Sequence, residues 1–147
     1  MQGSVGAYAG DIDAVQTWQR LEDSRDAILV DVRSRAEWAF VGLPDLSSLG
    51  REPVMIEWQH FPGGARNEGF VDALAEELKA RGAAADTPIY FICRSGGRSA
   101  AAAAAMTAAG YRQCFNVAGG FEGRLDENRH RGALEGWKAA KLPWVQS

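Results

Sequence analysis

The chain has little of what would place it in several protein classes. Its 147 residues include only two cysteines and two histidines. Two cysteines are too few for a disulfide scaffold, and with two histidines they make a poor structural zinc site. No apolar run approaches the roughly 20 residues of a membrane-spanning helix. The formal net charge of −3 gives no reason to expect nucleic acid or a membrane as a partner.

The amino terminus also lacks the pattern of an export signal. Residues 1–6 (MQGSVG) contain neither a basic segment nor an apolar one. We therefore expect a cytoplasmic protein whose thiols stay reduced. The hydrophobic fraction of 46% and the charged fraction of 24% are ordinary for a soluble globular protein. A chain of this length predicts one domain over residues 1–147.

The most informative stretch runs from residue 88 to residue 105 (PIYFICRSGGRSAAAAAA). Residues 88–92 form a short β-branched and aromatic run, which predicts a buried strand. The alanine-rich segment that follows has the best helix-forming composition available. Cys93 therefore lies where a strand ends and a helix is about to begin.

The polar residues after Cys93 predict an anion-binding loop with a thiol at its base. Glycines let backbone N–H groups turn inward, and a helix start leaves several N–H groups unpaired. Such donors and two guanidinium groups would favour a thiolate, the nucleophilic form of cysteine. A buried cysteine is more often a small hydrophobe, but these polar neighbours are unsuited to a core. The predicted site is catalytic Cys93 with Arg94, Ser95, Gly96, Gly97, Arg98 and Ser99.

The rest of the chain alternates predicted strands and helices. Strands are expected over 6–10, 27–32, 53–58, 88–92 and 113–117. Helices are expected over 14–22, 68–81, 97–109 and 134–139, with loops over 41–51 and 59–68. This alternation predicts an α/β fold with a mainly parallel central sheet and helices on both faces.

Local signals refine two of these helices. Asp11 or Asp13 can cap the first helix, whose Val15, Trp18 and Leu21 recur at three-residue steps and are expected to face the core. The sequence from Ser34 to Glu37 matches a capping box, which predicts a short helix through Trp38 and Phe40.

The six residues from Cys93 to Arg98 resemble the active-site loop of rhodanese-type sulfurtransferases. Four residues separate Cys93 from Arg98, whereas protein tyrosine phosphatases have five between the corresponding pair. Asp31-Val32-Arg33 resembles a segment found early in rhodanese domains, and Ala118-Gly119-Gly120-Phe121 resembles the stretch that closes them. The resemblance covers about residues 7–124 and leaves 125–147 as a C-terminal extension.

This resemblance implies a rhodanese-like fold and transfer of sulfane sulfur. The Cys93 thiolate would take the outer sulfur of a small sulfur-containing anion such as thiosulfate. The resulting persulfide would pass it to a thiophilic acceptor, which is cyanide in vitro and a thiol or protein in the cell. No metal or organic cofactor is implied. Arg94 would bind the donor, and Arg98 would brace the loop through a carboxylate such as Asp31 or Glu37.

Several alternatives stay open at this point. The chain could be a Cys-based phosphatase or arsenate reductase on the same scaffold, or a sulfur-carrier or interaction module without turnover. Asp31 and Arg33 are candidate supporting residues, but a local pair that fixes a turn explains them as simply. The family's usual histidine is missing, and His60, which follows a strand, cannot be assumed to replace it. Cys114 is expected in the core.

Overall fold

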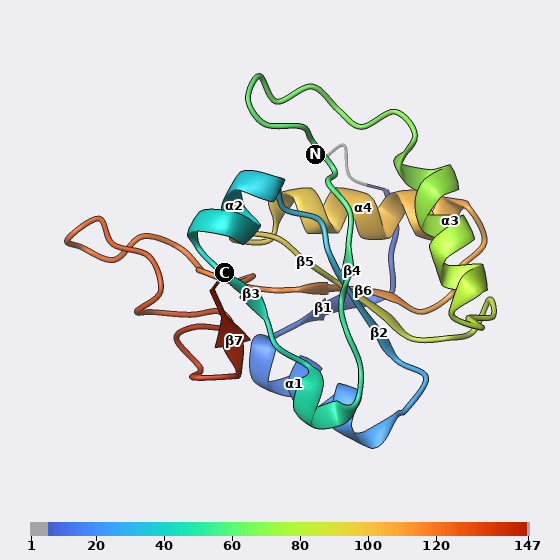
Figure 1. The fold of residues 1–147 in the computed structure, drawn as a ribbon, viewed down its shortest axis with the longest axis horizontal. Helices are drawn as coiled ribbons and strands as arrows, with labels where there is room; N and C mark the ends of the chain where they lie inside the picture. The colour runs from blue at the N-terminus through green and yellow to red at the C-terminus, as the bar shows by residue number, and fades with distance from the viewer. Residues whose placement is uncertain (1–5, 147) are drawn as a thin grey trace.

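Figure 1 shows the computed structural model, which describes residues 6–146; the remaining residues of the predicted 1–147 domain lie outside this range. A five-stranded sheet with the order β1-β6-β5-β2-β4 forms the centre. All its strand pairs are parallel, so the predicted α/β architecture is confirmed. The strands are Gly10–Ile12 (β1), Ile28–Asp31 (β2), Val54–Met55 (β4), Ile89–Ile92 (β5) and Cys114–Val117 (β6).

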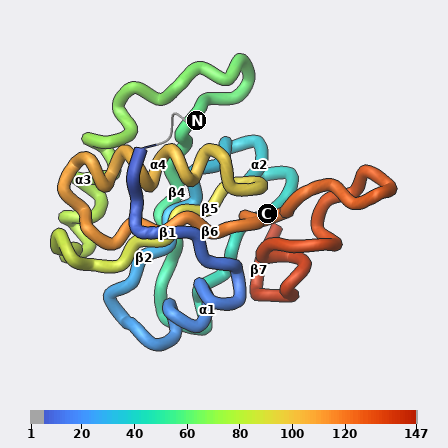
Figure 2. Tube along the Cα trace, turned by 180° about the vertical axis from the view of Figure 1, so that it is seen from behind, coloured from blue at the N-terminus to red at the C-terminus, as the bar shows by residue number. Residues whose placement is uncertain are grey.

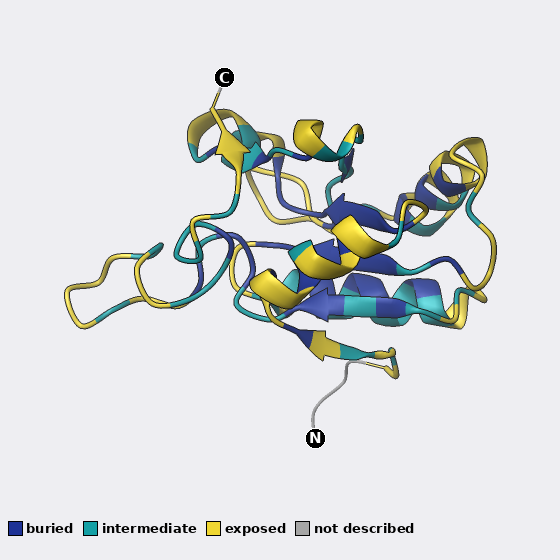
Figure 3. Ribbon diagram, turned by 90° about the horizontal axis from the view of Figure 1, so that it is seen from below, coloured by how far each residue is buried: buried dark blue, intermediate teal, exposed yellow. Residues whose placement is uncertain are grey.

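Helices cover both faces of this sheet (Figures 1 and 2). Helices α3 (Phe70–Ala80) and α4 (Gly97–Ala108) pack on one face, and α1 (Ala14–Asp23) packs on the other. Alternate residues of β5 enter the two cores, because successive side chains of a strand point to opposite faces. Both faces are therefore apolar, and Figure 3 shows the central strands as the buried part of the molecule.

Two helices follow directly from the sequence. Helix α2 (Arg35–Phe40) begins with the predicted capping box, in which Ser34 and Glu37 bond to each other's backbone N–H. In α4 the alanine run allows close approach to the sheet, and Ala102 and Ala103 are fully buried. The helix predicted over 97–109 is thus confirmed to within one residue.

The amino-terminal predictions need two corrections. The edge strand is Gly10–Ile12 rather than 6–10. Asp13 caps α1 as one of the two predicted candidates, but Val15 is 45% exposed instead of core-facing. Thr17 is buried on the core-facing side of α1 instead. Its hydroxyl can be buried because it donates a hydrogen bond to the Asp13 carbonyl.

The middle and C-terminal predictions also need correction. The strand expected over 53–58 is regular only at Val54–Met55. The helix predicted over 134–139 is absent, since Gly136 has a φ of 97° and the segment forms turns. Instead, β7 (Trp144–Val145) pairs antiparallel with β3 (Leu43–Pro44), within the predicted 41–51 loop. The same loop also holds the 3₁₀ turn η1 (Ser47–Leu49).

The C-terminal extension packs against the body of the domain. Trp137 is fully buried and its ring meets that of Trp18 edge to face, with centroids 5.8 Å apart. The extension therefore lies beside the carboxyl ends of the strands, where the Cys93 loop also lies (Figure 1). Within residues 6–146, no helix has the length and apolar character needed to cross a membrane.

Candidate functional site

Cys93 lies directly after β5, at the base of the loop formed by residues 93–99, called here the Cys93 loop. The residue is only 1% exposed. Its Sγ accepts hydrogen bonds from the backbone N–H groups of Gly96 at 3.1 Å and Ser99 at 3.4 Å. The Ser99 Oγ lies 3.2 Å from the same sulfur. The two backbone N–H groups are donors suited to an anion.

The backbone of the loop and the start of α4 produce this arrangement. Gly96 has a φ of 123°, a conformation that side chains disfavour, and it directs its N–H toward the sulfur. Ser99 belongs to the first turn of α4, where backbone N–H groups lack helical partners. The helix dipole adds to the attraction for negative charge at this end.

The segment after β6 closes the loop from behind. The N–H of Phe121 donates to the Cys93 carbonyl at 2.8 Å, and Glu122 and Gly123 donate to the Arg94 carbonyl. Gly120 has a φ of 60°, and a Cβ there would overlap the carbonyls of Cys93 and Arg94. The glycine is therefore required for the closing segment to lie this near the loop.

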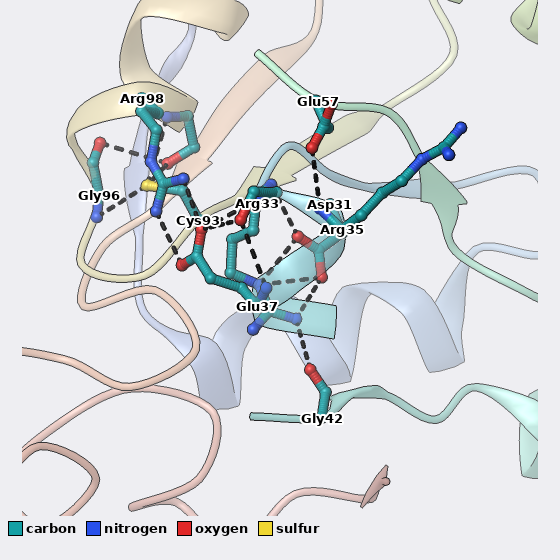
Figure 4. Close-up of polar contacts among 11 residues, drawn as sticks. Asp31, Arg33, Arg35, Glu37, Gly42, Glu57, Cys93, Gly96 and Arg98 are labelled. Atoms are coloured by element: carbon teal, nitrogen blue, oxygen red, sulfur yellow. Dashed lines mark hydrogen bonds and ion pairs between the residues drawn. The ribbon is translucent and has the colours of Figure 1, made fainter. Parts of the chain in front are cut away.

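Arg98 binds Glu37 at two points, as Figure 4 shows. Its Nη1 lies 2.7 Å from one carboxylate oxygen and its Nη2 lies 3.0 Å from the other. Burial alone would raise the pKa of Glu37, but hydrogen bonds from Arg98 and Ser34 outweigh it and lower the pKa to about 2. The pKa of Arg98 is raised, chiefly by the bond to Glu37 and to a smaller extent by the charge of Cys93.

Asp31 and Arg33 form a second, fully buried pair (Figure 4). The Arg33 Nη2 lies 2.7 Å from the Asp31 carboxylate and also donates to the Gly42 carbonyl at 2.8 Å. The guanidinium lies 4.2 Å from the centroid of the Phe121 ring. The pair therefore joins β2 to the closing segment, and no hydrogen bond of the described residues links either side chain to Cys93.

A cleft of about 550 Å³ opens over the loop, which contributes Arg94 and Arg98 to its lining. Arg94 is exposed, and no described residue forms an ion pair or hydrogen bond with its guanidinium. Arg131, from the C-terminal extension, lines the same cleft and donates to the Gly123 carbonyl. The cleft therefore presents cationic side chains to an incoming anion. Its lining also includes Ser34, Ala36, Glu37, Val41, Gln59, Phe61, Arg98 and Glu122.

A larger cavity of about 690 Å³ lies at the opposite end of the sheet, around the start of β2. Its Arg51 guanidinium donates to the carbonyls of Ser24, Ala27 and Leu21 at the end of α1. Because this arginine satisfies backbone groups and no residue of the Cys93 loop lines the cavity, size alone does not mark the site.

The other two residues considered from sequence lie apart from the thiol. His60 Nδ1 lies 2.8 Å from Glu57 Oε1, and no hydrogen bond within residues 6–146 joins His60 to Cys93. Cys114 is buried in β6, and burial raises the pKa of its thiol to about 11. A thiol of that acidity is almost entirely protonated at neutral pH.

Sequence reasoning missed a polar chain that leads away from the sulfur. Ser99 Oγ lies 2.5 Å from Asn116 Oδ1, Asn116 Nδ2 donates to Asp11 at 2.9 Å, and the Tyr8 hydroxyl donates to the same Asp11 oxygen at 2.8 Å. The available signal was a polar residue, Asn116, within an otherwise apolar strand. Arg131 in the cleft was also missed, because nothing local relates the extension to the loop.

Comparison with known proteins finds one matching family model, two sequence relatives and one similar crystal structure. The model described as the STR4 middle domain matches residues 9–147. An uncharacterized protein of Rickettsia conorii is 34% identical over 133 residues, which are 90% of this chain and 94% of that protein. A sulfurtransferase of Allochromatium vinosum is 30% identical over 110 residues, 75% of this chain and 82% of that one. The crystal structure of Rv0390 from M. tuberculosis is 50% identical, with a TM-score of 0.84, over 96% of this chain and 100% of that one.

Proposed function

The chain belongs to the rhodanese-like sulfurtransferase family, in the group of the STR4 middle domain, and from that premise we propose a specific reaction. The protein moves sulfane sulfur from a donor anion such as thiosulfate to a thiophilic acceptor through a persulfide on Cys93. One observation carries the proposal: the Cys93 sulfur accepts backbone N–H bonds from Gly96 and Ser99 beneath a cleft lined by Arg94, whose guanidinium has no partner among the described residues.

In the first half-reaction the Cys93 thiolate attacks the outer sulfur of thiosulfate. A bond forms between the two sulfurs, the sulfur–sulfur bond of thiosulfate breaks, and its electron pair leaves with sulfite. The terminal persulfide sulfur now bears the negative charge, and the inward N–H groups of the loop stabilise it. No oxidant or reductant is needed.

In the second half-reaction an acceptor nucleophile attacks the terminal sulfur. In vitro, the cyanide carbon forms a bond to this sulfur and the product is thiocyanate. The persulfide sulfur–sulfur bond breaks, and its electron pair restores the Cys93 thiolate. A small thiol or a protein thiol takes the sulfur in the cell. We expect this acceptor chemistry in the cytoplasm, where a reduced pool supplies thiols.

Two arginines of the loop have separate roles in this reaction. The Arg94 guanidinium, which has no partner among the described residues, binds the dianionic donor together with Arg131 of the extension. Arg98 is already bound to Glu37 and braces the loop. The Asp31–Arg33 pair supports the site from below by fixing the closing segment through Phe121.

A thiosulfate and cyanide assay tests this function. Wild type and Cys114→Ala are expected to produce thiocyanate at similar rates, whereas Cys93→Ala is expected to give only the uncatalysed rate. Replacing cyanide with a protein dithiol then shows whether protein thiols also accept the sulfur, from the rate of sulfur transfer to that protein. Thiocyanate formation by Cys93→Ala at the wild-type rate would refute the role of this thiol.

A further inference from the structure

The polar chain that begins at Ser99 runs across the α4-covered face of the sheet to its edge strand. Ser99 lies in α4, Asn116 in β6 and Asp11 in β1, so three elements converge on one hydrogen-bonded line. Ser99 is fully buried and Asn116 is 6% exposed, whereas Asp11 lies at the surface. The line therefore joins the buried sulfur of Cys93 to an exposed carboxylate.

The charges on this line fix which way the Asn116 amide points. A carboxylate only accepts hydrogen bonds, so the amide must direct its NH₂ toward Asp11. The amide oxygen of Asn116 then faces Ser99 and can only accept. Tyr8 supports the same arrangement, because burial and its bond to Asp11 raise the pKa of its hydroxyl, which stays a donor.

Ser99 has one hydroxyl hydrogen and three acceptors within reach. Its Oγ lies 3.2 Å from the Cys93 sulfur, 3.2 Å from the Gly96 carbonyl and 2.5 Å from the Asn116 oxygen. The shortest contact takes the hydrogen. The side of Oγ that faces the sulfur is then a lone pair, which accepts from a Cys93 S–H and offers nothing to a thiolate.

We propose that Asn116, oriented by Asp11, is a positioning residue that turns the Ser99 hydroxyl away from Cys93 and so restrains ionisation of the nucleophile. The restraint balances the two backbone N–H groups that favour the thiolate. A thiolate with fewer hydrogen bonds is populated at higher pH but is intrinsically more nucleophilic. The inference deepens the proposed function, since it concerns the reactivity of the same sulfur.

Other charged groups also face the sulfur and must stay unchanged in a test. Arg98 of α4 interacts with the charge of Cys93, and Glu37 of α2 neutralises Arg98. Asp31, at the end of β2, is neutralised by Arg33. None of these four side chains hydrogen-bonds to Asn116, so a substitution there alters the hydroxyl direction and leaves the ion pairs in place.

The test is the pH profile of Cys93 alkylation by iodoacetamide in a Cys114→Ser background. Asn116→Leu has a similar volume and no acceptor, so the Ser99 hydroxyl becomes free to donate to the sulfur. We expect the midpoint to move to lower pH by about one pH unit, the effect of one hydrogen bond. We also expect the plateau rate at high pH to fall. An unchanged or raised midpoint in the folded variant would overturn the proposal.

A double-mutant cycle separates positioning from general loosening of the site. In a Ser99→Ala background, Asn116→Leu is expected to leave the midpoint unchanged, because no hydroxyl remains to redirect. A shift that persists without Ser99 would contradict the proposal. Should Asn116→Leu fail to fold, the surface variant Asp11→Asn takes its place. A neutral amide at position 11 allows the Asn116 side-chain amide to flip, so that its NH₂ faces Ser99 and the Ser99 hydroxyl is free to donate to the sulfur. We expect this variant to lower the midpoint in the same Ser99-dependent way.

These measurements need no sulfur donor. A protein that is inactive toward thiosulfate but shows the Ser99-dependent shift would retain the positioning role and lose the proposed function. A protein that transfers sulfur from thiosulfate but lacks the Ser99-dependent shift would retain the proposed function and lose the positioning role.

Discussion

The Arg98 guanidinium and the Glu37 carboxylate meet at two hydrogen bonds of 2.7 and 3.0 Å, although 61 positions separate them in the chain. The contact joins the Cys93 loop to α2 and lies largely out of water, with side-chain exposures of 23% and 19%. Arg98 is therefore held in place by Glu37, while Arg94 in the same loop stays unpaired among the described residues.

The first prediction separates the two loop arginines. Arg98→Ala leaves the Glu37 carboxylate without its partner and is expected to cost about 1–3 kcal/mol of unfolding free energy. Arg94→Ala is expected to leave stability near wild type and to raise the KM for thiosulfate, since it removes donor binding common to ground and transition states. Thermal melts and steady-state kinetics on both variants measure these effects.

Arg98→Lys is the matched control, because a lysine keeps the charge and loses the two-point geometry. It is expected to fall between wild type and Arg98→Ala in stability. If Arg98→Ala raises KM without loss of stability while Arg94→Ala leaves KM unchanged, the two roles are reversed.

The second prediction concerns the stability of the fold at acid pH, which depends on the ionisation of Glu37. The pKa of Glu37 falls from its ordinary value of 4.5 to about 2 on folding. A depressed carboxyl pKa contributes stability above the unfolded value, and this contribution is lost as pH falls from about 4.5 toward 2. At about 1.4 kcal/mol per pKa unit it amounts at neutral pH to roughly 3–4 kcal/mol, which screening by water at this partly exposed pair reduces to roughly 2–3 kcal/mol.

Urea unfolding of wild type and Glu37→Gln at several pH values measures this. We expect the variant to be less stable at neutral pH and the difference to shrink as the pH approaches 2. A difference that stays constant with pH would mean that Glu37 does not ionise against Arg98 as described.

Much of this arrangement could be predicted because its signals are local. A short apolar run before Cys93 and an alanine-rich run after it are sufficient to place the thiol between a strand and a helix. The capping box from Ser34 to Glu37 likewise needs only four residues. Each of these signals lies within one turn or one strand, so no tertiary contact had to be known.

The parts that could not be predicted depend on contacts between distant segments. The β3–β7 pair brings Leu43 beside Val145, and neither strand is long enough to have a pattern of its own. The Asn116–Asp11 contact requires knowing that β6 lies beside β1. The sequence could not decide between Glu37 and Asp31 as the partner of Arg98, because this choice depends on how α2, β2 and α4 lie relative to one another.

The third prediction tests the close contact behind the loop. Gly120→Ala puts a Cβ against the carbonyls of Cys93 and Arg94 and adds the strain of a positive φ. We expect a loss of about 2–4 kcal/mol in stability together with a loss of sulfur transfer, because overlap and strain add.

Gly132→Ala is the control for Gly120→Ala. Gly132 has a φ of 90° but open space around its Cα, so only the strain remains and about 1 kcal/mol is expected. Equal losses in the two variants would show that overlap with the loop contributes nothing.

The fourth prediction concerns loop size. The loop spans six residues from Cys93 to Arg98, and the backbone N–H groups of Gly96 and Ser99 converge on one sulfur atom. A phosphoryl group brings three further oxygens, and each unpaired polar group in such a site costs about 1–3 kcal/mol. Two such mismatches lower a rate roughly 10²-fold or more. Wild type is expected to transfer sulfur and to show almost no aryl phosphatase activity; faster hydrolysis of an aryl phosphate than sulfur transfer would contradict this.

The central claim is that Cys93 holds the sulfur in transit. Mass spectrometry of peptides after thiosulfate treatment, without an acceptor and at neutral pH, tests it most directly. We expect that the Cys93 peptide gains the mass of one sulfur atom in wild type and in Cys114→Ser, that cyanide removes this mass, and that Cys93→Ser gains none. A sulfur adduct on Cys114, or equal loading of Cys93→Ser, would contradict it.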